Sequence, residues 1–204
     1  AAAFLLLGYL AVNLAIAVFV PEYPWDLTAY IGAGLKAAGM SMVDVHAQAW
    51  AIAKEANSPE SFANLSAGDD YRTRQSTDPA AFDSMLPLYA VKVGYVYLLG
   101  LLAPILGWAK AGLALSITAA VVLSVTIFAW LMKSRALQTA PFIIAVLIVG
   151  NFDETIRNAT PDSLAACLIV AGAWCWVKGG KVAGYALFLG AFLFRPDTVL
   201  FLFA

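Results

Sequence analysis

The stretch AGLALSITAAVVLSVTIFAWLM, residues 111–132, contains no charged side chain. As an α-helix it rises about 33 Å, and the hydrocarbon core of a bilayer is about 30 Å thick. The whole composition agrees, because 62% of the 204 residues are hydrophobic and only 12% are charged. A soluble domain carries about 25% charged residues, so lipid must solvate part of this apolar surface. The sequence therefore predicts an all-α membrane protein, and the net charge of −1 gives no indication of a nucleic-acid partner.

Further apolar runs extend this prediction to a polytopic membrane helix bundle. The runs cover residues 1–20, 136–151, 163–177, 182–194 and 198 onward. We expect a first transmembrane helix at 1–20 and a bundle at 111–204 with about five further spans, the last one cut short. The later runs are short and need flanking residues or a thinner bilayer. The first run lacks a basic start, which favours an anchor over a signal peptide. Because the chain stops inside its last run, we expect a portion of a longer protein.

Residues 21–110 form the predicted loop between the first helix and the bundle. The part from Pro21 to Ser84 holds nine of the chain's 13 carboxylates. Two stretches in it have helical spacing. Leu27–Met40 is expected to end at Gly39, and Met42–Ala56 reads as an amphipathic helix lying on the membrane. We therefore predict a large outer-face loop that contains amphipathic juxtamembrane helices.

The run Met85–Trp108 is long enough to cross the bilayer, but it contains Lys92. If it lies along the interface instead, two short basic turns fall on one side of the membrane and the acidic loops fall on the other. The basic turns hold Lys133, Arg135, Lys178 and Lys181. Short basic turns face the cytoplasm under the positive-inside rule. We therefore predict that this run does not cross, in a multi-pass protein of the plasma (inner) membrane with its large loop outside.

Asp26 is the first candidate catalytic residue. It lies five residues after Pro21 and immediately before the helical stretch that begins at Leu27. Aspartate is a favoured N-cap, so a purely structural role is one interpretation. A partly shielded carboxylate at the membrane surface also suits a general base that deprotonates an acceptor hydroxyl.

Asp153 and Glu154 are adjacent carboxylates at the outer end of the third run. One interpretation is a solvated turn in which Arg157 pairs with either acid, because it follows them at helical spacing. The other is a site for a hard divalent cation, which prefers oxygen ligands. In that case Asp26 and Asp153 are the candidate metal ligands, and a divalent ion is the cofactor that the sequence allows.

Two segments share the pattern x-Pro-Asp-Ser/Thr, and each opens an apolar run. They contain Asp162 and Arg195. Proline and aspartate suit a first helical turn, whereas an arginine there suits either a phosphate clamp or a contact with lipid headgroups. Arg72 and Arg74, in the acidic loop, either balance charge or provide a second phosphate contact. The single histidine, His46, is weak evidence for any chemistry.

The order of these features resembles the GT-C superfamily of integral membrane glycosyltransferases. A carboxylate follows the first span in Trp25-Asp26-Leu27, a Pro-Leu-Tyr segment follows at Pro87-Leu88-Tyr89, and an acidic outer turn runs from Asp153 to Leu164. Members use polyprenyl-phosphate sugars as donors and include protein O-mannosyltransferases and the lipid A aminoarabinose transferase. Many members have an Asp-Glu pair where Asp26 stands alone here, and they have more spans than this chain.

The resemblance implies a role for each candidate. The carboxylate after the first span is the catalytic base or a metal ligand, which corresponds to Asp26. A second acidic position corresponds to Asp153 or Glu154, with Asp162 as a substrate contact. An arginine that holds the donor phosphate corresponds to Arg195. The run from 85 to 108 corresponds to juxtamembrane helices on the outer face.

The resulting hypothesis is an enzyme that transfers a sugar from a polyprenyl-phosphate donor to an acceptor at the outer membrane face. Its expected partners are membrane lipids, the donor and other proteins of a membrane complex. The alternative is a non-catalytic membrane subunit that scaffolds a larger complex. A transporter is disfavoured because Lys92 is the only charge that interrupts an apolar run.

Overall fold

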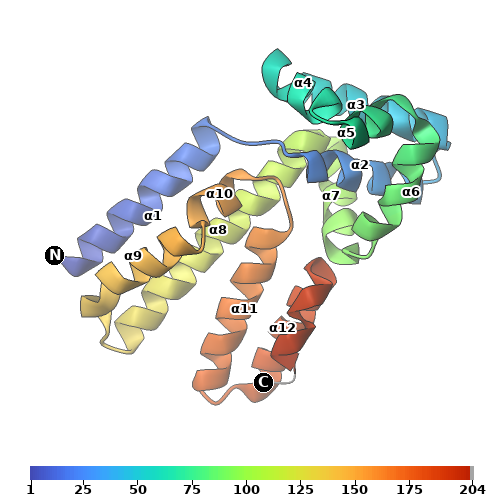
Figure 1. Cartoon of the computed structure of the whole chain (residues 1–204). Coiled ribbons are helices and arrows are strands. Elements are labelled where there is room, and N and C mark those ends of the chain that lie inside the picture. The colour runs from blue at the N-terminus through green and yellow to red at the C-terminus, as the bar shows by residue number, and fades with distance from the viewer. Residues whose placement is uncertain (203–204) are drawn as a thin grey trace. The chain divides into compact units, whose positions relative to one another are not determined.

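The computed structural model describes residues 1–202, and this part of the chain is all-α, as predicted. It contains 12 α-helices and two short 3-10 helices, with one isolated bridge between Glu22 and Asn158 and no strand. The chain divides into two compact units (Figure 1). The first comprises Ala1–Glu22 together with the chain from Ala114 onward, and the second is Tyr23–Leu113.

The first unit is built around its N-terminal helix. Its elements are α1 (Ala2–Phe19), most of α8 (Trp108–Lys133), η1 (Leu137–Thr139), α9 (Ala140–Val149), α10 (Phe152–Arg157), α11 (Asp162–Val177), α12 (Lys181–Phe194) and η2 (Pro196–Leu202). Helix α1 packs against α9 and α10. One buried cluster joins Leu6 and Leu10 of α1 to Leu123 of α8 and Ile156 of α10. The core thus draws on segments more than 100 residues apart in the sequence.

Two helices of the described chain are long and apolar enough to cross a membrane, α1 and α8. The other apolar segments, Leu137–Val149, Asp162–Val177 and Lys181–Phe194, are shorter. A helix of 16 residues rises only about 24 Å. The sequence also predicted a span from Thr198 onward; this part begins as the 3-10 helix η2, and residues 203–204 lie outside the described chain. Length and composition therefore support two spans, or three if Pro79–Ala90 and Val93–Leu106 together form one broken span, rather than the six expected.

The short helices end where the backbone turns. Asn151, just after α9, has φ +50°, and Gly179, just after α11, has φ +84°. At Gly179 the amides of residues 179 and 180 donate to the carbonyls of Trp176 and Cys175. This is the Schellman arrangement, which satisfies the last carbonyls of a helix and stops it.

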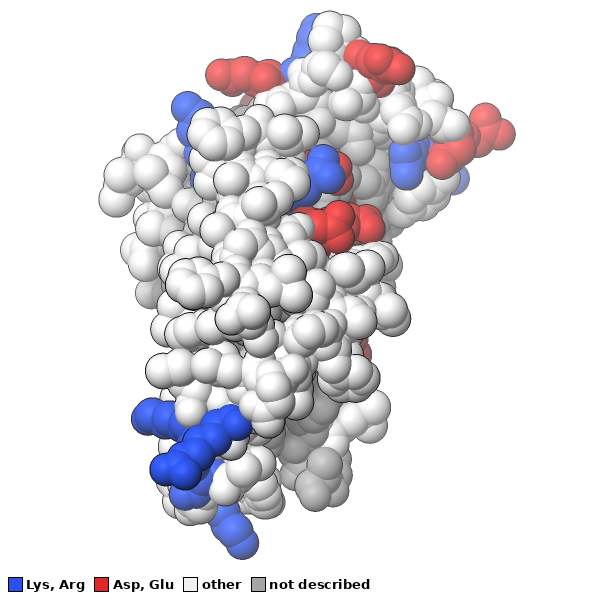
Figure 2. Space-filling model, turned by 90° about the vertical axis from the view of Figure 1, so that its left-hand side faces the viewer, with Lys and Arg blue, Asp and Glu red and all other residues white. Residues whose placement is uncertain are grey.

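Charge in the first unit is divided between its two ends. The Lys133 ammonium, at the end of α8, lies 5.2 Å from the ring centroid of Trp174, near the end of α11. At the other end of these helices, the Ser116 hydroxyl donates to the Asn158 carbonyl, and Arg157 pairs with Glu22. Figure 2 shows basic side chains gathered at one end of the visible face, with a broad uncharged area next to them. Such an uncharged belt is typical of a membrane-embedded surface.

The second unit packs around α2 (Trp25–Ala37), in which every residue from Leu27 to Leu35 is buried. Its other helices are α3 (Met42–Ala56), α4 (Pro59–Ala67), α5 (Asp70–Thr77), α6 (Pro79–Ala90) and α7 (Val93–Leu106), followed by the first turns of α8. Helix α2 packs against α3, α6 and α7. At Gly32 an added Cβ would lie 2.7 Å from the Phe82 ring, so α2 and α6 meet closely. The expected turn at Gly39 is confirmed, with φ +85°.

Helix α3 has the predicted range, but its apolar face is not free to lie on a membrane. Val45, Ala49 and Trp50 are buried inside the second unit, where α3 packs against α2 and α6. Val43, near the start of the same helix, is 67% exposed. The apolar face of α3 packs on protein, because α2 is buried from Leu27 to Leu35 and α3 is one of the helices that cover it.

The run Met85–Trp108, which is long enough to cross the bilayer, is not one straight helix. Helices α6 and α7 meet at a break near Lys92 and are bent by 110°. Together they are apolar enough for a broken span or a re-entrant segment. That the run does not cross the bilayer stays a prediction.

Candidate functional site

Asp26 is the second residue of α2, and its side chain is half-buried. The N-cap position belongs to Pro24, and no side chain caps this helix, so the interpretation of Asp26 as an N-cap is wrong. Its Oδ1 accepts a hydrogen bond of 2.9 Å from the Tyr89 hydroxyl of α6. No residue of the described chain donates to Oδ2. One carboxylate oxygen is thus held in place and the other is available to a ligand.

Tyr89 stays protonated at neutral pH. Burial is the main reason that its pKa is raised, and the charge of Asp26 and the hydrogen bond between the two side chains raise it further. A phenol in this state donates to a carboxylate throughout the range in which the carboxylate is ionised. Tyr89 therefore fixes the orientation of Asp26.

Lys92 lies on the other side of Tyr89, in the turn between α6 and α7. Its ammonium lies 5.0 Å from the ring centroid of Tyr30 and 5.5 Å from that of Tyr89, and it donates to the Tyr30 hydroxyl. Cation–π contacts of this kind stabilise a partly desolvated ammonium. Lys92 forms no ion pair with any residue from 1 to 202, so its charge is not neutralised by a carboxylate.

An aromatic group surrounds the start of α2. The Trp25 ring lies 5.5 Å from that of Trp50 on α3 and 6.0 Å from that of Tyr71 on α5, centroid to centroid. The Arg72 guanidinium lies 5.9 Å from the Trp25 ring. Ligand sites combine such aromatic walls with a few polar groups, and here the polar groups are Asp26 and two cations.

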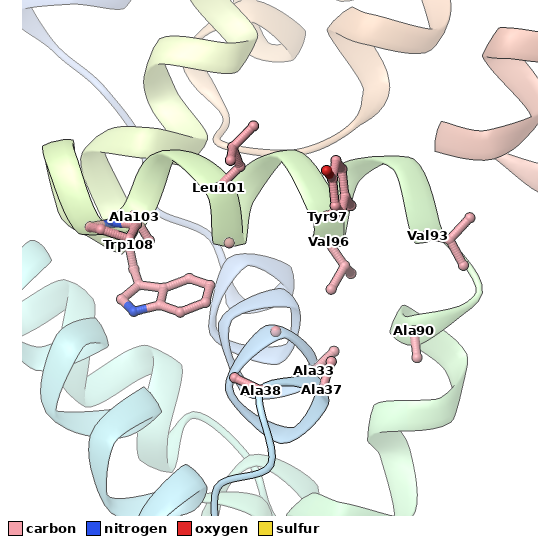
Figure 3. A pocket seen from close by; sticks show the side chains of 13 residues that line it. Ala33, Ala37, Ala38, Ala90, Val93, Val96, Tyr97, Leu101, Ala103 and Trp108 are labelled. Atoms are coloured by element: carbon pink, nitrogen blue, oxygen red, sulfur yellow. The ribbon is translucent and has the colours of Figure 1, made fainter.

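An apolar cavity of about 680 Å³ lies in the same unit, between the later part of α2, α7 and Trp108 (Figure 3). Small residues make room for it, among them Ala33 and Gly34 of α2 and Gly100 of α7. A Cβ on Gly34 would lie 2.8 Å from the Trp108 ring, so this wall is closely packed.

Lys92 does not itself line the cavity, but its neighbours in the chain do. Ala90 and Val93, close to Lys92 in the chain, line the cavity. Lys92 also contacts the Tyr89 ring, and Tyr89 holds Asp26. A carboxylate, a cation and an apolar cavity therefore follow one another along this part of the second unit.

The predicted partner of Asp153 and Glu154 is wrong. Both acids are exposed on α10, and neither forms an ion pair or a side-chain hydrogen bond within the described chain. Arg157 instead pairs with Glu22 and donates to the Val20 carbonyl. The backbone explains this choice, because Glu22 and the segment after α10 exchange backbone hydrogen bonds, which brings Glu22 next to Arg157. Asp153 and Glu154 are two solvated carboxylates.

Arg195, the candidate phosphate contact, is paired with two aspartates. It donates through Nε and one terminal nitrogen to the two carboxylate oxygens of Asp197, at 3.1 and 2.9 Å, and it also pairs with Asp162. Hydrogen bonding to Asp197 is the largest of the effects that raise its pKa. A phosphate would have to displace two carboxylates that already neutralise the guanidinium. Asp162, at the start of α11, is likewise occupied by Arg195 and by the Thr160 hydroxyl.

The remaining candidates have individual surroundings. Arg72 donates to the Asn64 carbonyl and pairs with Asp69, whereas Arg74 is exposed and has no partner in residues 1–202. His46 contacts the Gln75 carbonyl at 3.1 Å and packs against the Phe82 ring, which is a structural position. Within the described chain no group of three or more His, Cys, Asp or Glu residues is arranged to hold a metal ion.

The sequence predictions of a joint site involve both units. Asp26 belongs to the second unit, and Asp153, Glu154, Asp162 and Arg195 belong to the first. The proposed approach of Asp26 to Asp153 or Glu154, and a metal held by Asp26 and Asp153, stay predictions.

Comparison with known proteins adds no assignment: no protein-family model matches the chain, and no curated protein or solved structure does. The residues that sequence reasoning missed are Tyr89 and Lys92. Each had a signal, since Tyr89 closes the Pro-Leu-Tyr segment and Lys92 is the only charge in its apolar run. A partly buried charge within an apolar run is costly unless it is paired or used, which makes it a candidate functional group.

Proposed function

We propose that the second unit carries the active site of a glycosyltransferase of the GT-C type, which transfers a sugar from a polyprenyl-phosphate donor to an acceptor hydroxyl. The observation that supports it best is the sequence of groups from Asp26 through Lys92 to the apolar cavity. A lipid-linked sugar phosphate has three matching parts: a sugar, a phosphate and an apolar tail.

In the proposed reaction, the acceptor oxygen attacks the anomeric carbon while the bond from that carbon to the phosphate oxygen breaks. Asp26 takes the hydroxyl proton through Oδ2, and polyprenyl phosphate leaves with the bonding electron pair. A general base of this kind accelerates a reaction by roughly 10²–10⁴-fold. Attack from the side opposite the leaving group inverts the anomeric configuration. The Trp25 ring provides a flat surface for the sugar beside the carboxylate.

Lys92 is the proposed contact for the donor phosphate, in place of Arg195. It has no carboxylate partner in the described chain, whereas Arg195 has two. A cation next to the leaving phosphate stabilises the charge that develops there. The apolar cavity next to Lys92 accepts the first isoprene units of the tail.

The proposed topology is a multi-pass protein of the plasma (inner) membrane with the second unit on the outer side. The charge division of the first unit supports it, because basic turns at one end match the positive-inside rule. In this arrangement α6 and α7 lie along the interface, and Lys92 reaches the headgroup level.

The test is binding of undecaprenyl monophosphate to the purified chain in nanodiscs, followed by sugar transfer in membranes supplied with polyprenyl-phosphate sugars. Gly100→Leu fills the cavity, since a Cβ at that position points toward Trp108 at 3.9 Å, and Lys92→Met removes the charge. Both should weaken binding by about tenfold or more. Gly8→Leu is the matched control, because nothing lies within 4 Å of a Cβ there.

Asp26→Asn separates catalysis from binding. It should bind undecaprenyl monophosphate as the unmodified chain does and lose transfer by roughly 10²–10⁴-fold. Binding that is equal in Gly100→Leu and Gly8→Leu, together with sugar transfer no higher than in membranes without the chain, would favour the non-catalytic membrane subunit.

A further inference from the structure

A second cavity of about 480 Å³ lies in the second unit, between α3 and the junction of α7 with α8. Its lining differs from that of the apolar cavity because opposite charges contribute to it. Glu55 and Gln48 come from α3, and Lys110 comes from the first turn of α8. Tyr23, Ile52 and Leu106 complete most of the wall. The proposed glycosyl transfer uses none of these residues.

The two charges of this cavity do not neutralise each other. Neither Glu55 nor Lys110 forms an ion pair with any residue of the described chain. Opposite charges that line one cavity more than 4 Å apart leave room for a ligand that carries both signs. An anionic ligand would meet Glu55, and a cationic ligand would meet Lys110, so a zwitterion fits better than either.

The hydrogen-bonding groups define the zwitterion further. The Glu55 carboxylate accepts hydrogen bonds, which a primary ammonium donates and a quaternary ammonium does not. Lys110 donates to phosphate oxygens, and the Gln48 amide and Tyr23 hydroxyl offer neutral donors. Burial raises the pKa of Tyr23, which keeps this hydroxyl protonated.

The position of the cavity in the chain indicates the source of such a ligand. Lys110 directly precedes the charge-free stretch from 111 to 132 in α8, a helix long and apolar enough to cross a membrane. A lysine at the end of a membrane helix lies at the level of the lipid headgroups. Ile52 and Leu106 add an apolar wall of the kind that contacts the glycerol and first methylenes of a lipid.

We propose that this cavity binds the phosphoethanolamine headgroup of a membrane phospholipid, with the ammonium on Glu55 and the phosphate on Lys110. Trp108 lines both this cavity and the apolar cavity, but the proposed headgroup contacts use no residue of the proposed sugar-transfer site and do not depend on it.

The test measures lipid preference with the full chain. The chain is reconstituted in nanodiscs with equal amounts of phosphatidylethanolamine, phosphatidylcholine and phosphatidylglycerol, and retained lipid is identified by native mass spectrometry. Phosphatidylethanolamine should be enriched over the other two. Glu55→Gln should reduce its preference over phosphatidylglycerol by roughly tenfold, because one charge-assisted contact is lost. Lys110→Gln should reduce retention of both phosphatidylethanolamine and phosphatidylglycerol.

Matched controls are available in the same unit. Glu60→Gln and Lys54→Gln make the same changes at exposed positions that do not line the cavity. Circular dichroism tests whether each variant is folded. If Glu55→Gln does not fold, Lys110→Gln is the variant that tests the proposal. Equal retention of the three lipids overturns the proposal, as does an identical profile for Glu55→Gln and Glu60→Gln. Binding of free glycine that depends on Glu55, without enrichment of phosphatidylethanolamine, overturns the lipid assignment.

Discussion

Removing the Tyr89 hydroxyl tests whether Asp26 works as an oriented base. Tyr89→Phe deletes one hydrogen bond, of 2.9 Å, and keeps the ring that packs against Tyr30 with centroids 5.1 Å apart. A hydrogen bond to a charged acceptor contributes about 1.5–3 kcal/mol. If all of it serves to orient Asp26, transfer should fall by roughly 10- to 150-fold. The free energy of unfolding should fall by no more than about 1.5–3 kcal/mol, the contribution of this one hydrogen bond, because the packing of the ring is preserved.

The double variant gives the sharper result. Asp26→Asn alone should cost roughly 10²–10⁴-fold in transfer. If Tyr89 acts only through Asp26, adding Tyr89→Phe to Asp26→Asn should cost nothing more, since residues that act as a unit are not additive. Initial rates of sugar transfer in membranes measure all four members of the cycle. Tyr185→Phe is the control, because it removes a hydroxyl from the first unit and keeps a ring contact with Trp176.

Two results would refute this reasoning. Full transfer by Tyr89→Phe would mean that the hydrogen bond does not orient the base. Multiplication of the two losses in the double variant would mean that Tyr89 acts on the substrate independently of Asp26.

Three further predictions concern the rest of the chain. Gly172→Ala should lower the free energy of unfolding by about 1–3 kcal/mol, because its Cβ would lie 2.7 Å from a phenyl ring. Gly190→Ala is the control and should not lower it, because the nearest contact of its Cβ is at 3.5 Å. Chemical denaturation in detergent measures both variants. A cysteine in place of Lys110, in a background without native cysteines, should react with an impermeant reagent from the outer side, and one in place of Lys133 should not; the reverse would mean that the predicted topology is wrong. Arg195→Lys should leave sugar transfer unchanged and cost about 1 kcal/mol or less in stability, since its ion pairs are partly exposed; a severe loss of transfer would restore Arg195 as the phosphate clamp.

The fold class followed from sequence because charge-free runs and helical spacing are local properties. The range Met42–Ala56 was confirmed at both ends, and the turn at Gly39 was expected from the residue itself. The face of α3 was misassigned because hydrophobic spacing marks an apolar side without saying whether lipid or protein covers it. The neighbours of that side, α2 and α6, come from other parts of the chain.

Pairing of charged residues was the least predictable feature. Arg157 lies at helical spacing from two acids and nevertheless pairs with Glu22, 135 residues away. An ion pair between Arg157 and Asp153 or Glu154 would be an exposed surface pair, which stabilises a protein only weakly. The backbone bridge between Glu22 and Asn158 already holds Glu22 next to Arg157, so their pairing requires little further loss of chain entropy. Long-range backbone contacts of this kind have no signal in a single sequence.

The pairing of charged residues is also the reason that Lys92, rather than Arg195, is the proposed phosphate contact. Arg195 matched a motif, but the two aspartates of the matching motifs, Asp162 and Asp197, neutralise it. Lys92 matched none, and an ammonium that is partly buried within an apolar run is costly unless it is contacted or used. Tyrosine rings stabilise this ammonium without cancelling its charge, which leaves it free to attract an anion. For a site that must bind a phosphate beside an apolar tail, the uncompensated cation is the better physical criterion than the motif.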